Sequence, residues 1–205
     1  MARYTGPTCR NCRRVGMKLC SKPPNKCAWE RRKSPPGDRS LRRRRDTEYG
    51  TQLREKQKAR AMYGILERQF RNYFEKARNR PGGTGENLLQ MLERRLDNVV
   101  YRLSFAVSRQ QARQLVNHGH IRVNGKKTDI PSYLVNQNDV IEWKESSKEK
   151  DVYKNATESI ASLPVPDWLE LNASAMSGHV RICLLYTSDA ADEGLGVDLG
   201  GRRII

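Results

Sequence analysis

The chain has 205 residues, and its thirty-nine Lys and Arg against twenty-three Asp and Glu give a formal net charge of +16. This balance favours a polyanionic partner, because each phosphate that a basic side chain neutralises releases counterions. With 37% hydrophobic residues, the chain is expected to form one or two domains with modest cores. We find no long apolar run and no apolar signal core at the start. We therefore expect no membrane partner and no secretory leader, and reduced cysteines.

Four of the five cysteines lie in the first thirty residues, at Cys9, Cys12, Cys20 and Cys27. The Cys9-x-x-Cys12 spacing is typical of a zinc knuckle, in which one tight turn presents two thiolates to a tetrahedral ion. Cys20 and Cys27 would complete a structural four-cysteine zinc site. The alternative is four unrelated free thiols.

Positive charge is concentrated near the N-terminus. Residues 1–60 hold nineteen Lys or Arg and five Asp or Glu, a net of +14. Within them, Pro35-Pro36-Gly37 opposes regular structure and is followed by the run Arg42, Arg43, Arg44 and Arg45. We expect this run to be an arm that orders against phosphates, although nuclear signals and solvated tails have similar sequences.

From Thr47 to Ala77 the apolar spacing predicts helix, with Phe70, Tyr73 and Phe74 as core rather than as base-stacking residues. Four basic residues are expected on the exposed side of this helix: Arg54, Lys56, Lys58 and Arg60. Of these, Arg54 and Lys58 are expected to contact nucleic acid. The glycine-rich residues 80–85 predict a break, after which Glu86 begins a long helix. No Lys-Ser/Thr pair follows these glycines, so they are not a nucleotide-phosphate loop.

Residues 94–143 predict two helices and a small sheet. Leu92, Leu96, Val99 and Leu103 form one apolar stripe at helical spacing. Ser108 is a good N-cap, and Gln111 three residues later completes a capping box. Ala112, Leu115 and Val116 are expected to face inward, and Gly119 to end the helix.

The strand signal of Ile121 and Val123 continues into Asn124-Gly125, a strong hairpin signal, and Val140–Trp143 is expected to close the sheet. Basic and polar side chains gather along this helix-turn-strand edge, with Arg95 and Arg102 away from the apolar stripe and Arg109 and Arg113 sharing an outer edge. The alternative is a small domain whose charges only solvate its surface. The expected nucleic-acid contacts are Arg95, Arg102, Arg109, Arg113, His118, His120, Arg122, Asn124, Lys126 and Lys127.

The run SRQQARQLVNHGHIRVNGKK, with IPSYLV and NDVIEW, resembles the RNA-binding module of the S-four family of small-subunit ribosomal proteins. LREKQKARAMYGILERQFRNYFEKA and LERRLDNVVYRL extend the resemblance to that ribosomal family, over residues 1–181. It implies an α+β, mainly helical fold with an inserted module of the alpha-L type. The implied domains are a basic extension at 1–45, a helical domain at 46–93 completed by 144–182, and the module at 94–143.

The resemblance implies a structural, cytoplasmic ribosomal role without catalysis. The implied partners are the 5′ domain of 16S ribosomal RNA and small-subunit proteins near the path by which messenger RNA enters. Some family members repress their own message. Some also carry a cysteine cluster, usually with a longer loop before the last cysteine, so Cys20 is off the expected position and is the weakest predicted ligand.

Two other classes stay open. An RNA-modifying enzyme or aminoacyl-tRNA synthetase could carry the module, but the remaining segments are too short and basic for a catalytic domain, and His118 and His120 have no assignable acid/base partner. A zinc-containing DNA-binding regulator is the second alternative.

The last residues have a different character. CLLYTSDAAD at Cys183–Asp192 and GVDLGGRRII at Gly196–Ile205 match the translations of a sequencing-adapter string and of a flow-cell primer, in one reading frame. We therefore interpret residues 183–205 as an artefact that truncates the natural sequence near Arg181. Before it, Pro164, Pro166, Trp168 and Leu169 are expected to pack back on the helical domain.

Overall fold

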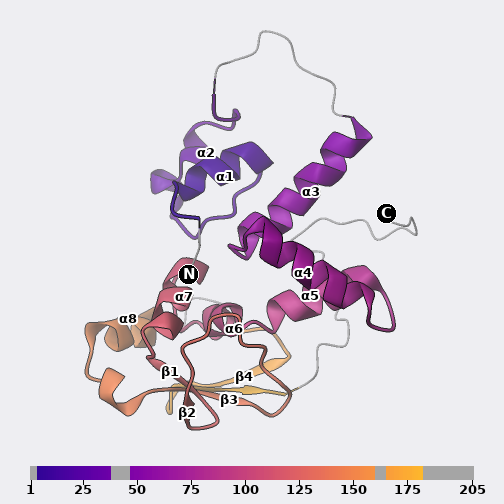
Figure 1. Ribbon diagram of the computed structural model, residues 1–205. Coiled ribbons are helices and arrows are strands. Elements are labelled where there is room, and N and C mark those ends of the chain that lie inside the picture. Colours follow the sequence, from indigo (N-terminus) through magenta and orange to yellow (C-terminus); the bar gives the residue numbers. More distant parts are fainter. Residues whose placement is uncertain (1–3, 38–46, 160–164, 182–205) are drawn as a thin grey trace. The chain divides into compact units, whose positions relative to one another are not determined.

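The computed structural model describes residues 4–37, 47–159 and 165–181. The chain divides into two compact units, with the described residues up to Glu67 in the first and those from Arg68 onward in the second. Helices and one small antiparallel sheet make up these residues (Figure 1), which confirms the α+β, mainly helical fold class. Among the described residues, no helix has the length and apolar character needed to cross a membrane.

The first unit consists of short helices followed by a longer one. Its elements are α1 (Thr8–Val15), the 3-10 helix η1 (Pro24–Lys26), α2 (Ala28–Arg31) and α3 (Glu48–Met62). Contacts from α1 reach both α2 and α3. The hydroxyl of Thr47 accepts a hydrogen bond from the Gly50 N–H at 3.1 Å, so this residue caps α3.

The helix predicted from Thr47 to Ala77 is interrupted. α3 ends at Met62, Gly64 has a φ of 63°, and α4 runs over Glu67–Arg78. The apolar spacing continues through the break and does not mark it. On α3, Lys58 is only 8% exposed and pairs with Glu55 at 3.3 Å, so its predicted place on the exposed side is wrong.

The second unit contains nearly all of α4, then further helices and the sheet. Its other elements are α5 (Thr84–Glu93), α6 (Leu96–Arg102), α7 (Arg109–Asn117), β1 (Ile121–Val123), β2 (Lys126–Lys127), β3 (Val140–Trp143), η2 (Glu145–Ser147), α8 (Asp151–Ser159), β4 (Leu169–Asn172) and β5 (Ser177–Val180).

The prediction of one long helix carrying Leu92 and Leu103 on a single stripe is wrong. α5 ends at Glu93, and Arg95 has extended backbone (φ −67°, ψ 134°) before α6 begins. The Leu96 N–H donates to the Tyr133 carbonyl at 2.8 Å, and the Arg94 carbonyl accepts from the Val135 N–H at 2.9 Å. A loop distant in sequence therefore satisfies the backbone groups that a continuous helix would pair internally.

The five strands have the order β2-β1-β3-β5-β4, and all neighbours are antiparallel. Ile121 lies opposite Trp143, and Ile141 lies opposite Gly178. β3 was expected to close the sheet, but β5 pairs with it and β4 forms the edge. Trp168 and Leu169, the first residue of β4, belong to the core that the sheet shares with α6 and α7, whereas the sequence predicted that they pack on the helical domain.

The core of the second unit lies between the helix pair α6–α7 and the sheet. Phe105 and Trp143 have ring centroids 5.9 Å apart, and Tyr153 of α8 meets the Trp143 ring edge-on at 5.3 Å. Full burial of a large apolar side chain such as that of Phe105 contributes about 1.5–3 kcal/mol. The inward residues predicted on the second helix, Ala112, Leu115 and Val116, belong to this core. The same packing fixes the surface presented by α6, α7 and β1.

Candidate nucleic-acid interface

Helix α7 has the predicted Ser108 N-cap, but the Gln111 side chain reaches the residue before the cap and not the Ser108 N–H of a capping box. The Ser108 hydroxyl accepts from the Gln111 N–H at 3.3 Å, and the Gln111 side chain accepts from the Val107 N–H at 3.0 Å. The helix terminates at Gly119, which has a φ of 69°. A Cβ there would collide with the far end of the Lys127 side chain, so this side chain reaches from the β1–β2 hairpin to the end of α7.

Arg109 is the first residue of α7 and is held from two sides. Its Nε donates to the Asn98 side-chain oxygen at 2.9 Å, and its guanidinium lies over the Tyr101 ring, 4.6 Å from the centroid. Arg102 lies on α6 and donates to the Glu93 carboxylate through Nε at 3.1 Å and Nη2 at 3.0 Å. Asn98 also donates to the Glu93 carboxylate at 2.7 Å, so the predicted contacts Arg102 and Arg109 belong to one hydrogen-bond network.

Two other predicted arginines are buried. Arg95 is 1% exposed, and its guanidinium donates to both Asp97 oxygens at 3.0 and 2.7 Å and to the Tyr73 hydroxyl at 2.9 Å. Arg113 is 8% exposed, because it lies between Ala112 and Val116 on the buried side of α7. The predicted exposed positions of Arg95 and Arg113 are therefore wrong.

The electrostatics of Arg95 follow from this burial. Removal from water lowers the pKa of the guanidinium, but the Asp97 carboxylate and the Tyr73 hydroxyl outweigh it and raise the pKa above its ordinary value. The group is a permanent buried cation.

The two histidines follow the end of α7. His118 is exposed, and the His118 and His120 ring centroids are 6.1 Å apart. His120 Nδ1 shares a hydrogen bond with the Ser147 hydroxyl at 2.9 Å. Burial lowers the pKa of His120, and the positive charges of Lys150 and Lys144 and the neighbouring His118 lower it further. The surroundings of His120 therefore favour its neutral form.

The β1–β2 hairpin has the predicted turn, with Asn124 and Gly125 at φ 51° and 74°. The Asn124 side chain donates to Asp139 at 2.8 Å and accepts from the Val140 N–H at 2.8 Å, so it ties the turn to β3. Lys126 and Lys127 are exposed. The hairpin therefore presents lysines, while the asparagine is used to hold its shape.

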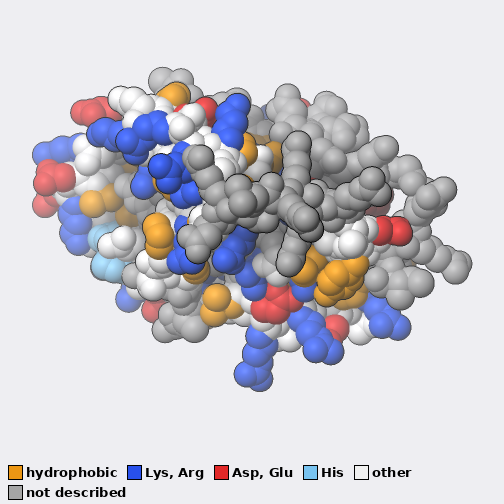
Figure 2. All heavy atoms as spheres, turned by 90° about the horizontal axis from the view of Figure 1, so that it is seen from above, with side chains coloured by type: hydrophobic (Ala, Val, Ile, Leu, Met, Phe, Trp, Pro, Cys, Tyr) orange, Lys and Arg blue, Asp and Glu red, His pale blue; other side chains and the backbone are white. Residues whose placement is uncertain are grey.

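The remaining predicted contacts divide by position. Arg54 is exposed on α3. The run Arg42, Arg43, Arg44 and Arg45 lies outside the described residues. Lys and Arg side chains outnumber acidic ones on the face shown in Figure 2.

Sequence reasoning missed Glu93 and Asn98, which connect the arginines. Glu93 is 9% exposed and Asn98 2% exposed. Polar residues inside an apolar run signal buried polar partners. The sequence does show such polar residues here. The prediction assumed one continuous helix, however, and the break at Arg95 changes which side of the helix each later residue faces.

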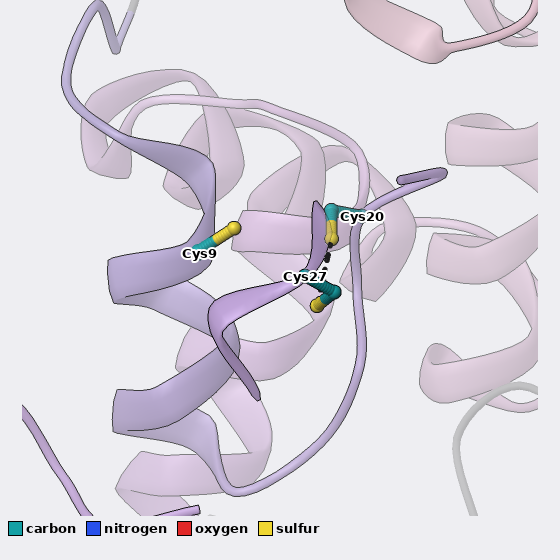
Figure 3. Close-up of side chains that lie close together, drawn as sticks. All are labelled: Cys9, Cys20 and Cys27. Carbon is teal, nitrogen blue, oxygen red and sulfur yellow. Dashed lines mark hydrogen bonds between the residues drawn. The ribbon is translucent and has the colours of Figure 1, made fainter. Parts of the chain in front are cut away.

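Three of the four N-terminal cysteines form a close group in the first unit (Figure 3). The sulfur atoms of Cys9, Cys20 and Cys27 lie within 4.8 Å of one another, and those of Cys20 and Cys27 are 3.6 Å apart. Cys12 is buried, and its sulfur accepts from the Leu19 N–H at 3.4 Å. Cys20, predicted as the weakest ligand, is thus inside the group, and Cys12 is outside it.

The thiols of this group have opposite tendencies. Burial raises the pKa of Cys20 to about 12, with smaller contributions from the Cys27 and Cys12 thiols. Burial also acts to raise the pKa of Cys27, but hydrogen bonds from the backbone of Trp29 and Glu30 and from Cys20 lower it overall. Cys27 precedes α2, where helix N–H groups stabilise a thiolate.

Basic side chains on a rigid helix-turn-strand edge, in a chain of this net charge, define a nucleic-acid-binding protein. Comparison with known proteins gives the family. Residues 3–93 match the Ribosomal protein S4/S9 N-terminal domain, and residues 94–141 match the S4 domain.

Individual relatives agree with these matches. Small ribosomal subunit protein uS4 of Thermodesulfovibrio yellowstonii is 56% identical over 182 residues, which cover 87% of this chain and 88% of the relative. The uS4 protein of Thermoanaerobacter pseudethanolicus is 58% identical over 184 residues, 88% of each chain. That of Thermotoga petrophila is 55% identical over 203 residues, covering 97% and 96%. The chain belongs to the uS4 family of small-subunit ribosomal proteins, whose members are structural proteins and not enzymes.

Proposed function

We propose that this chain is a structural constituent of the small ribosomal subunit that binds the 5′ domain of 16S ribosomal RNA early in assembly. Its place would be beside other small-subunit proteins near the path by which messenger RNA enters, with effects on translational accuracy and on its own message. The supporting observation is the match to the S4 domain over residues 94–141, which carry the arginine network.

The chemistry of the proposed contacts suits folded RNA. A-form RNA hides its base edges in a deep groove, so recognition depends on shape, phosphates and 2′-hydroxyls. Arginines held on helices can donate to phosphates through paired N–H groups. The proposed contacts omit the buried Arg95, Arg113 and Lys58. They comprise Arg102, Arg109, His118, His120, Arg122, Asn124, Lys126, Lys127, Arg54 and Arg42 to Arg45.

We propose that the binding module is residues 94–143, after a basic extension at 1–45 and a helical segment at 46–93. Competition binding at physiological salt tests the RNA proposal against the DNA-binding alternative. A 16S 5′-domain transcript should displace labelled RNA about a hundredfold better than duplex DNA of equal length. Equal competition by DNA would contradict the proposal.

We further propose that the cysteines of the first unit hold a structural zinc ion. Tetrahedral zinc with Zn–S bonds of about 2.3 Å places its sulfur ligands a little under 4 Å apart. The 3.6 Å separation of the Cys20 and Cys27 sulfurs and the 4.8 Å limit for the three-cysteine group fit this requirement. Cys9, Cys20 and Cys27 would supply three ligands, and the neighbouring Cys12 the fourth.

Metal analysis tests the zinc proposal. Protein purified without chelator should contain about one zinc per chain. Cys20→Ser should lose the metal and destabilise the first unit, and Cys183→Ser, at the fifth cysteine, should lose neither metal nor stability. Metal-free wild-type protein that melts normally, or equal zinc in both variants, would contradict a structural zinc site.

We infer that residues 183–205, which lie outside the described residues, derive from adapter sequence. The support is the match of two separate segments in one reading frame. Amplification of the gene from source DNA should give a different sequence after residue 182.

A further inference from the structure

Glu93 is a carboxylate in an unusual position, at the end of α5 and 9% exposed. Its two oxygens accept three side-chain hydrogen bonds. Oε2 accepts from Asn98 Nδ2 at 2.7 Å and from Arg102 Nε at 3.1 Å, and Oε1 accepts from Arg102 Nη2 at 3.0 Å. The paired bonds to Arg102 set both the direction and the plane of its guanidinium.

Asn98 extends this arrangement to a second arginine. Its amide nitrogen donates to the Glu93 carboxylate and also to the Glu93 carbonyl at 3.1 Å. Both bonds orient the nitrogen toward Glu93, so the amide oxygen faces Arg109 and accepts from its Nε at 2.9 Å. Tyr101 supports the other side of that guanidinium. Three successive helices, α5, α6 and α7, are joined by this chain of contacts.

A negative charge at this place is unfavourable for RNA binding at long range, because it offsets the field of the basic surface. Any favourable contribution of Glu93 to RNA binding must therefore come from the way it orients neighbouring basic side chains. Arginine side chains lose considerable rotamer freedom when a ligand immobilises them, and side chains already held in place lose less. The contacts of Arg102 and Arg109 provide such preorganisation.

We propose that Glu93 is a positioning residue for RNA binding, which holds Arg102 directly and Arg109 through Asn98. This inference rests on the proposed function, and it adds a residue that does not itself touch the RNA. It also reverses the sign expected from charge alone: neutralising Glu93 weakens RNA binding, although the net charge becomes more positive.

The test compares two substitutions that remove one negative charge each. Glu93→Gln places an amide where three donors converge, so at least one hydrogen bond is lost. Binding to a 16S 5′-domain transcript should become about tenfold weaker. Glu145→Gln is the control, because Glu145 is 73% exposed and pairs with Lys148 at 2.7 Å, away from the network. It should bind as tightly as the wild type or slightly more tightly.

A double-mutant cycle separates positioning from general support of the fold. In an Arg102→Ala/Arg109→Ala background, Glu93→Gln should no longer weaken binding, because the groups through which it acts are gone. A loss of equal size in that background would overturn the proposal. So would wild-type affinity in the single variant with a normal thermal melt.

Asn98→Ala provides an independent test if Glu93→Gln does not fold. It should weaken RNA binding in the wild-type background and less so in the Arg109→Ala background, where only its contact with Glu93 remains. An equal loss in both backgrounds would overturn the proposal. Absence of RNA binding by the wild-type chain would instead contradict the proposed function and is read from the same titration.

Discussion

The buried guanidinium of Arg95 joins two helices of the second unit. Asp97, two residues later, accepts at 2.7 and 3.0 Å, and Tyr73 of α4 accepts at 2.9 Å with its ring centroid 5.7 Å away. The backbone of Arg95 leaves the helix here, which directs the side chain inward. The bond to Tyr73 therefore holds α4 against the start of α6. The Asp97 carboxylate compensates the guanidinium charge, which has almost no access to water.

Removing one partner of this pair should be costly. Asp97→Asn leaves the Arg95 charge uncompensated in the core, so the free energy of unfolding should fall by about 3–5 kcal/mol. Urea denaturation measures this change. The control is Glu170→Gln, because Glu170 and Arg181 form a pair at 3.0 Å with more than half of each side chain exposed. That change should cost less than about 1 kcal/mol, and equal losses would contradict the assignment.

At the scale of elements, β5 passes close to the end of α6. Gly178 lies opposite Ile141 in the sheet, and a Cβ built on it would collide with the Leu103 side chain. Leu103 is fully buried at the end of α6. The absence of a side chain at residue 178 thus lets the helix pack directly against the strand.

Gly178→Ala should lower the free energy of unfolding by about 1–3 kcal/mol, because the added methyl group overpacks this contact. The chain offers a matched control in Gly85→Ala, since a Cβ on Gly85 of α5 meets nothing within 4 Å. That change should be neutral or stabilising. The double variant Gly178→Ala/Leu103→Ala should lose less unfolding free energy than the sum of the losses in the two single variants, because the smaller side chain at residue 103 leaves room for the methyl group. Additive losses would place the strain elsewhere.

Local signals were sufficient for part of this architecture. The Ser108 cap, the end of α7 at Gly119 and the Asn124-Gly125 turn are each determined within a few residues, and the structure confirms them. The break at Arg95 depends on hydrogen bonds to Tyr133 and Val135, far along the chain. Periodicity contains no information about such partners, so it predicted a continuous helix.

The same distinction applies to the candidate site. Arg109 was correctly associated with the surface of α7, because it follows directly from the N-cap. Arg95 was misplaced because the helix breaks at this residue, and Arg113 because it lies on the buried side of α7. Glu93 and Asn98 were missed because their importance comes from contacts across three helices, which no sequence spacing expresses.

At the scale of the whole molecule, charge is the dominant property. Residues 183–205 contain two Arg and four acidic residues, so a chain without them has a net charge of +18 instead of +16. The described basic side chains of both units lie before this segment. Long-range attraction to RNA should therefore not depend on it.

Deletion of residues 183–205 should leave RNA affinity unchanged within about twofold and change the free energy of unfolding by less than about 1 kcal/mol. If residues 183–205 are translated from adapter sequence, as proposed, they have no core selected for them, and ordering them would cost about 1–2 kcal/mol of backbone entropy per residue. Urea denaturation and RNA titration of the shortened chain measure both quantities. Deletion from Ser177 onward is the control, because it removes β5 and uncouples β4 from β3, and it should unfold the second unit. If the shorter deletion also abolished folding or RNA binding, residues 183–205 would be a genuine part of the protein.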